Sequence, residues 1–128
     1  MSAKRGFTLD AGALIAFERG EPRVRLILRR ADAADRRITV PATVVAEAWR
    51  GGRRRWLEDL LRIATVEPLT DELARRAGEL LARSGTSNTV DATVAVSAAQ
   101  RGDIIVTSDP GDMQLFADDL PAIRVLGL

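Results

Sequence analysis

The sequence of 128 residues contains no cysteine, no histidine and no tyrosine, and these absences exclude several classes of site. Without thiolate or imidazole ligands the chain cannot build the usual structural or catalytic zinc centres. Triads in which histidine activates serine or cysteine are excluded for the same reason, as are disulfide bonds. Acid–base or metal chemistry must therefore rest on carboxylates, hydroxyls, arginine, the backbone or water.

Lysine is almost absent as well, because 18 of the 19 basic residues are arginine and only Lys4 is lysine. Schiff-base chemistry and lysine-dependent phosphate binding thus have no suitable residue. The chain also lacks an apolar run of ~18 residues that could cross a membrane. Its beginning, 1–5, leads into a strand-like segment without the apolar stretch of a signal peptide. We expect no membrane association and a cytoplasmic location.

What is present describes one folded domain. The hydrophobic fraction of 46% is sufficient for a sizeable core, and the basic and acidic residues nearly cancel at a net charge of +1. A chain of this length falls within the usual size of a single domain. We find no internal repeat, low-complexity segment or linker. The sequence therefore predicts a single domain over residues 1–128.

Short apolar runs rich in β-branched residues alternate with longer helical patterns. Strands are predicted at 6–9, 37–40, 63–67, 103–107 and 123–126. Helices are predicted at 11–18, 23–34, from Pro41 to the Gly51–Gly52 stop, 53–61, from Thr70 to the polar loop 84–89, 90–100 and 110–117. This succession predicts an α/β domain with an about five-stranded, mostly parallel sheet that is flanked by helices on both faces.

Four carboxylates fall where a functional residue of such a fold would lie, because open parallel sheets bind ligands beyond the carboxyl ends of their strands. Asp10 directly follows the first predicted strand, and Asp109 follows the fourth after one intervening residue. Asp91 stands at the start of a predicted helix. Glu47 lies in an apolar helical stretch, so we expect its carboxylate to be partly buried.

Each of these carboxylates also has a structural explanation. Asp10 and Asp109 could cap the helices that follow them, and Asp91 could complement the positive end of its helix. A partly buried Glu47 could form a salt bridge with one of the many arginines. For each residue taken alone, these alternatives stay open.

Taken together, the four carboxylates favour a metal site. In a doubly wound fold they would converge, and unpaired carboxylates at close range repel and raise one another's pKa. A hard cation removes this conflict, and ligands that are all oxygen suit Mg²⁺ or Mn²⁺. One or two such ions could polarise a phosphodiester and activate water near neutral pH.

The order of these acidic positions resembles the PIN domain, and more closely the VapC-type ribonuclease toxins of bacterial type II toxin–antitoxin systems. The resemblance covers essentially the whole chain. The motifs that carry it are Leu9-Asp10, Val45-Ala46-Glu47, Val90-Asp91-Ala92 and Val106-Thr107-Ser108-Asp109-Pro110-Gly111-Asp112. It implies a PIN-like fold and a Mg²⁺- or Mn²⁺-dependent endoribonuclease that leaves 5′-phosphate and 3′-hydroxyl ends. It further implies a homodimer and a VapB-type antitoxin whose C-terminal segment blocks the site.

The resemblance also assigns roles to single residues. It implies that Asp10, Glu47, Asp91 and Asp109 form a catalytic quartet. Asp10 and Asp91, together with Asp109, would be the metal ligands, and Glu47 would complete the site or hold water.

Three further residues would be auxiliary members of the same site. Asp112 lies one helical turn beyond Asp109, and Thr107 and Ser108 could hydrogen-bond a carboxylate or water at the same rim. Many members of the family have phenylalanine after the last aspartate, where this chain has Met113. The resemblance therefore assigns a role to Asp112 less closely than to Asp109.

Arginines that follow the Glu47 helix are candidates for contacts with RNA phosphates, namely Arg50, Arg53 and Arg54. When the four quartet acids are set aside, 19 basic residues face 14 acidic ones, which is a balance of +5. The alternative is that these arginines only solvate an exposed helix surface.

Other function classes are less consistent with the sequence. A catalytically silent PIN-like module that binds RNA or protein is the main alternative. A phosphoacceptor receiver domain needs a lysine that the chain lacks at the corresponding place, and a haloacid-dehalogenase-type phosphatase needs an aspartate where Gly12 stands. No glycine-rich dinucleotide fingerprint or Walker loop is present.

Overall fold

The computed structural model describes residues 4–128, in which five strands form one sheet with the order β3-β2-β1-β4-β5. All four strand pairings are parallel. The strands are β1 (Phe7–Leu9), β2 (Ile38–Pro41), β3 (Thr65–Glu67), β4 (Ile104–Thr107) and β5 (Arg124–Gly127). The predicted α/β class with a parallel sheet is thus confirmed. Residues 1–3, on which the absence of a leader was partly argued, lie outside the described part.

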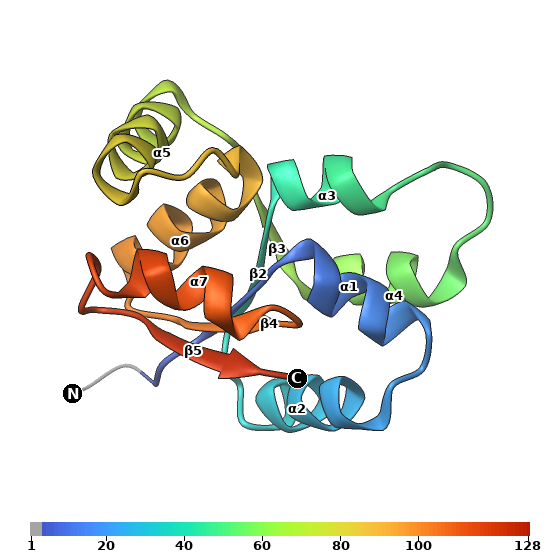
Figure 1. The fold of residues 1–128 in the computed structure, drawn as a ribbon. Helices are drawn as coiled ribbons and strands as arrows, with labels where there is room; N and C mark the ends of the chain where they lie inside the picture. Colours follow the sequence, from blue (N-terminus) through green and yellow to red (C-terminus); the bar gives the residue numbers. More distant parts are fainter. Residues whose placement is uncertain (1–3) are drawn as a thin grey trace.

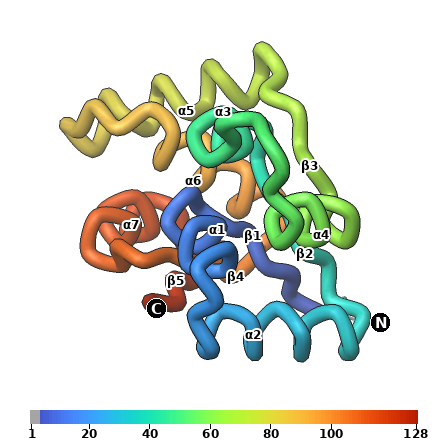
Figure 2. The backbone as a smooth tube through the Cα atoms, turned by 90° about the vertical axis from the view of Figure 1, so that its right-hand side faces the viewer, coloured from blue at the N-terminus to red at the C-terminus, as the bar shows by residue number. Residues whose placement is uncertain are grey.

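Seven helices connect and cover these strands. They are α1 (Ala11–Glu18), α2 (Pro22–Ala33), α3 (Ala42–Ala48), α4 (Arg55–Ile63), α5 (Asp71–Ser84), α6 (Thr89–Arg101) and α7 (Pro110–Ala117). Helices α1 to α4 lie on one side of the sheet and α5 to α7 on the other, as Figures 1 and 2 show from two directions. This arrangement follows from right-handed crossovers that run outward from β1 in one direction and from β4 in the other. No helix within residues 4–128 has both the length and the apolar character needed to cross a bilayer.

Helix α6 is the most deeply buried helix, since every residue from Ala92 to Ala98 is buried. Four of the seven residues in this stretch are small, either alanine or serine, so α6 can approach the sheet closely. Asn88 caps its beginning and Gly102, with a φ of 70°, ends it. Close packing against the sheet and the two caps therefore fix the position of α6, the helix that carries Asp91.

The predicted boundaries hold for α1 and α7, are shifted by two residues at each end of α4, and differ at both ends of α3. Pro41 is the last residue of β2 and precedes α3, whereas the sequence placed it inside the helix. The helix then ends at Ala48 instead of reaching Gly51–Gly52, because Trp49 is extended, with a ψ of 130°.

Arginine side chains satisfy the carbonyls that this early end leaves free. Arg50 donates to the carbonyl of Ala46 at 3.1 Å, and Arg54 donates to that of Ala48 at 3.2 Å. These bonds replace the backbone N–H groups of a further helical turn. The helix therefore stops before the two glycines.

Candidate active site

The candidate site lies at the carboxyl ends of β1 and β4, where the strand order reverses. Chain connections leave in opposite directions at such a point, so a crevice opens between the loops that follow the two strands. Helix α1 begins directly after β1, and α7 begins soon after β4. The first turn of α6 and helix α3 lie close by, because α3 packs against both α1 and α6.

Asp10 is the innermost carboxylate, with an exposed fraction of only 6%. Its Oδ1 accepts a hydrogen bond of 2.8 Å from the N–H of Ala13, so the predicted cap of α1 exists. Burial raises the pKa of Asp10, although hydrogen bonds from Thr107 and from the Ala13 backbone act in the opposite direction. The charges of Glu47 and Asp109 raise this pKa further. Within residues 4–128 no arginine or lysine forms an ion pair with Asp10.

Asp91 lies in the first turn of α6 and is half-buried. Its backbone N–H donates to Oδ1 of Asn88 at 3.0 Å. The pKa of Asp91 is raised to about 6, first by burial and then by the negative charges of Asp10 and Glu47, with smaller contributions from Asp112 and Asp109. Helix position alone would favour the ionised form here. Burial, together with the neighbouring carboxylates, therefore outweighs the helix dipole.

Asp109 and Asp112 form the exposed rim of the site at the start of α7. The N–H of Asp109 donates to Oγ1 of Thr107 at 2.9 Å. Oδ1 of Asp109 lies 3.5 Å from the N–H of Asp112, which is a weak capping contact. The charge of Asp109 raises the pKa of Asp112. The two carboxylates therefore stand close enough to repel each other.

Glu47 is exposed, and the prediction that it is partly buried is wrong. Helix α3 turns Val44 and Ala48 toward the core, and Glu47 lies about 60° from Val44 and about 100° from Ala48 around the helix, on the side that faces solvent. The salt bridge that was its structural alternative is not found among the described residues. Its charge nevertheless acts on Asp10 and Asp91, so its carboxylate borders the same cluster.

The cluster fits a divalent cation by donor type and charge. All donors are carboxylate or hydroxyl oxygens, and the buried negative charge of Asp10 has no basic partner in the described part of the chain. No three acidic side chains among residues 4–128 stand close enough to hold one ion together. Mg²⁺ commonly binds through one or two carboxylates and keeps several waters. The cluster among residues 4–128 therefore suits that mode, and it does not suit a closed cage made of protein ligands alone.

Thr107 and Ser108 pack closely against the carboxylate cluster. Thr107 is fully buried, with its hydroxyl between Asp10 and the backbone of Asp109. Ser108 is exposed and lies over Gly12, where a Cβ atom would stand 1.9 Å from the serine Oγ and 3.5 Å from Oδ1 of Asp10. A side chain at position 12 would therefore require the Ser108 hydroxyl to rotate away and the Ser108 Cβ, 3.0 Å distant, to shift slightly. No local pattern in the sequence marks Gly12 as a packing position, and it stands out there only as the place where a phosphatase of the haloacid-dehalogenase type has aspartate.

The three candidate RNA-binding arginines have different surroundings. Arg54 forms an ion pair with Glu18 of α1, with its Nε 2.6 Å from Oε2, and this pairing lowers the pKa of Glu18. Arg50 bonds to main-chain carbonyls. Arg53 is exposed, and no hydrogen bond or ion pair engages it within residues 4–128.

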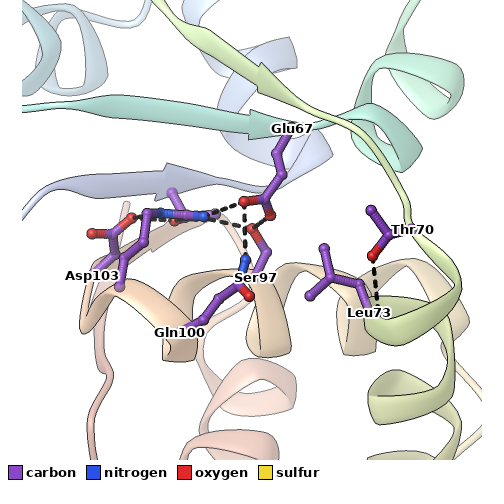
Figure 3. A network of polar contacts seen from close by, with 8 residues as sticks. Glu67, Thr70, Leu73, Ser97, Gln100 and Asp103 are labelled. Carbon is purple, nitrogen blue, oxygen red and sulfur yellow. Dashed lines mark hydrogen bonds and ion pairs between the residues drawn. The ribbon is translucent and has the colours of Figure 1, made fainter.

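A polar network ties α6 to β1 and β3 beneath the site, and Figure 3 shows it at close range. Arg101 contacts Glu67 at 2.5 Å, Asp103 at 2.9 Å and Thr8 at 3.0 Å. Ser97 and Gln100 of α6 also bond to Glu67. Thr8 precedes Asp10 by two residues in the β1 segment, so both side chains lie on the same side of that strand. The network therefore connects the helix of Asp91 to the strand of Asp10.

Comparison with known proteins gives a family and a fold. Residues 7–117 match the family model described as the PIN domain. VapBC2 from Rickettsia felis, solved with a DNA fragment from the promoter, is similar with a TM-score of 0.70 and 15% identity over 95% of this chain and 98% of that one. DNA-bound VapBC from Salmonella typhimurium has a TM-score of 0.70 and 21% identity over 97% and 98% of the two chains. FitAcB from Neisseria gonorrhoeae has a TM-score of 0.67 and 18% identity over 94% and 96%. No curated protein sequence matches significantly.

Proposed function

The chain belongs to the PIN domain family, and we propose that it is a VapC-like toxin. In this proposal it hydrolyses RNA phosphodiester bonds as a metal-dependent endoribonuclease. The observation that carries this proposal is the carboxylate cluster at the β1/β4 switch point. Its buried member Asp10 has no basic partner in the described part, and its charges raise one another's pKa. A site that only stabilised the fold would not collect unpaired carboxylates, because their repulsion opposes folding.

Of the predicted ligands Asp10, Asp91 and Asp109, one or two would bind Mg²⁺ or Mn²⁺ directly through carboxylate oxygens, and the remainder would act through waters on the cation. The cation, when bound, would supply Lewis-acid polarisation of the phosphate and activation of water. The N–H of Ala13 and the side chain of Thr107 fix the orientation of the Asp10 carboxylate. Glu47, exposed and bordering the cluster, is the carboxylate left to orient the attacking water and accept its proton.

The products would be RNA ends with a 5′-phosphate and a 3′-hydroxyl, and no covalent enzyme intermediate is involved. Arg53 is the best placed of the three arginines to contact an RNA phosphate, because its side chain is exposed and unengaged within residues 4–128. The auxiliary members of the site would hydrogen-bond its carboxylates or bound waters, and they are Asp112, Thr107 and Ser108. Arg54 would act mainly through its ion pair with Glu18.

The proposed partner is a VapB-type antitoxin. The similar structures are described as VapBC and FitAcB, which are complexes of two named components. Large apolar side chains are exposed on α1, α2 and α4, namely Ile15 (38%), Leu26 (43%) and Trp56 (51%). Exposed apolar side chains that gather on neighbouring helices are typical of protein interfaces. A small open reading frame beside this one would support the partner, and the homodimer stays a prediction.

Cleavage of RNA by the purified, antitoxin-free chain tests the proposed activity. We expect cleavage of a cellular RNA pool with Mg²⁺ or Mn²⁺ and none with a chelator. Asp10→Asn keeps a cap for α1 and should reduce the rate by roughly 100-fold or more. Mapping of 5′-phosphate ends in expressing cells, against the same variant, identifies the substrate. A folded protein that cuts no RNA in either metal would instead be the catalytically silent binding module.

A further inference from the structure

A hollow beside the carboxylate cluster is not used by the mechanism above. It has a volume of about 390 Å³. One wall is the segment Gly85–Asn88 with Asp91 at the start of α6, and the other is α7 with Asp112, Leu115 and Phe116. Helices α6 and α7 run side by side and hold these walls in place (Figure 1). Pockets that bind small organic groups have volumes of about 300–1,000 Å³.

The walls combine an apolar surface with polar groups that are free to bind. Phe116 forms a buried floor, and Leu115 is 53% exposed, which is the largest exposed fraction among the bulky apolar side chains together with Ile63. Oδ1 of Asn88 is occupied by the N–H of Asp91, and no bond engages its Nδ2 in the described part of the chain. The exposed Ser87 adds a hydroxyl. Such a surface offers contact to a flat ring and hydrogen bonds to its edge.

The hollow is continuous with the proposed catalytic centre, because Asp91 and Asp112 line both. A phosphodiester held at the cluster carries its own base within the reach of one nucleotide. The negative charges of Asp91 and Asp112 disfavour a second phosphate in the hollow. An uncharged ring can instead donate from an amino group to these carboxylates and accept with a keto group from Nδ2 of Asn88. This charge distribution selects the base over the backbone as the occupant.

We propose that this hollow receives the unpaired nucleobase of the nucleotide next to the cleaved bond, with Leu115 packing against the ring and Asn88 bonding its edge. The inference rests on the proposed function, since it places the scissile phosphate at the carboxylates. A base that lies within a duplex cannot enter, because its faces are stacked and its edge is paired.

Binding of RNA tests the inference without cleavage. The experiment compares Asp10→Asn with Asp10→Asn/Leu115→Ala and Asp10→Asn/Asn88→Ser, in Mg²⁺, by fluorescence anisotropy of a single-stranded and a duplex RNA of equal length. Serine retains the cap of α6 and removes only the amide. We expect each additional substitution to weaken single-strand binding by roughly tenfold and to leave duplex binding unchanged. The matched control is Ile63→Ala at the end of α4, whose side chain is also 53% exposed and which should change neither affinity.

An equal effect on both RNA forms, or none on either, overturns the inference and would leave the hollow to a protein segment. Cleavage of a randomised RNA pool by chains with Asp10 intact provides the second measurement. The wild type should prefer one base beside the cut, and Asn88→Ser and Leu115→Ala should relax that preference. Cleavage without any preference contradicts the inference while the proposed function stands. If the wild type cuts no RNA, the proposed function fails, and the binding experiment still decides the inference.

Discussion

Asp91 is the residue at which crowding of charge has its clearest consequence for stability. Its pKa of about 6 in the folded chain lies above the ordinary aspartate value of 3.8. The folded state therefore binds more protons than the unfolded state between these values, and the contribution of this group to stability falls as the pH rises from about 4 to about 6. Above about pH 6 the carboxylate is ionised in both states, and it lowers the free energy of unfolding by an amount that no longer changes with pH.

Asp91→Asn should therefore raise the stability of the metal-free protein at pH 7.5. Solvent screening of a half-exposed carboxylate limits the gain to about 1 kcal/mol, or a Tm increase of roughly 3–5 °C. The gain should fall to about half near pH 5 and vanish below about pH 4, and Mg²⁺ should stabilise the wild type more than the variant. Thermal melts from pH 4 to 8, with and without Mg²⁺, measure both effects. A large loss of stability at pH 7.5 would show that Asp91 is only a structural residue of α6.

Gly12 is the residue at which close packing shapes the site. A Cβ atom at this position would stand 1.9 Å from Oγ and 3.0 Å from Cβ of Ser108, so Gly12→Ala requires the Ser108 hydroxyl to rotate and Ser108 or α1 to shift by a few tenths of an ångström. We expect a loss of about 1–3 kcal/mol in unfolding free energy and a marked loss of RNA cleavage. The second-site change Ser108→Gly should restore most of both.

Gly78→Ala is the matched control for this substitution. Gly78 lies within α5, and nothing stands within 4 Å of its Cβ position. Alanine there should stabilise the chain by about 0.5–1 kcal/mol and leave cleavage unchanged. Melting curves and cleavage rates of the three variants complete the comparison. Gly12→Ala with wild-type stability and activity would contradict the close packing of β4 on α1.

The positions of some site residues could be predicted from the sequence, and those of others could not. The positions of Asp10 and Asp109 follow from strand ends alone, since parallel strands deliver their carboxyl ends to one edge. The exposure of Glu47 could not be predicted, because apolar neighbours in sequence do not reveal which side of a short helix faces the core. The contact of Gly12 with Ser108 joins residues about 100 positions apart, and no local pattern records it.

Among the elements, α6 depends on the network around Arg101. The side chains of Arg101, Glu67 and Asp103 are 16%, 19% and 3% exposed, so their charges are largely removed from water. Breaking such a group by removing one partner leaves buried charge without compensation, which costs about 3–5 kcal/mol.

Arg101→Met should therefore lower the unfolding free energy by about 3 kcal/mol or more. The triple change Arg101→Met/Glu67→Gln/Asp103→Asn should recover most of this loss, because no buried charge is then left unpaired. Denaturant titration of both variants measures the difference. If the single variant unfolds at the wild-type denaturant concentration, the network does not hold α6 against β1 and β3.

The element boundaries illustrate how far local signals reach. Helix α7 begins and ends as predicted because Asp109 and Pro110 specify its start within the sequence itself. Helix α3 ends early because Arg54, which is paired with Glu18 of α1, bonds to its last carbonyl. That end depends on a contact between segments 36 residues apart in the chain, which periodicity and capping rules do not contain.

For the whole molecule, a net charge of +1 conceals a separation of charge. The acidic residues that meet at the carboxyl ends of β1 and β4 form one negative region, and arginines follow α3 and cover other surfaces. The proposed association with RNA would then depend on which arginines are free. Each phosphate contact made by a free cation releases counterions, so the logarithm of the binding constant falls with the logarithm of salt concentration.

Arg53 and Arg54, adjacent in the sequence, should therefore differ when either is replaced by glutamine. Arg53→Gln removes an exposed cation and should reduce the slope of this salt dependence by about 0.7 for single-stranded RNA, with no change in Tm. Arg54→Gln breaks the pair with Glu18 and should lower the Tm while leaving the slope nearly unchanged. Anisotropy titrations of single-stranded RNA across a range of salt concentrations, together with melts, measure both quantities. Equal slopes for the wild type and Arg53→Gln would remove Arg53 from the RNA surface, and a reduced slope for Arg54→Gln would mean that its ion pair opens when RNA binds.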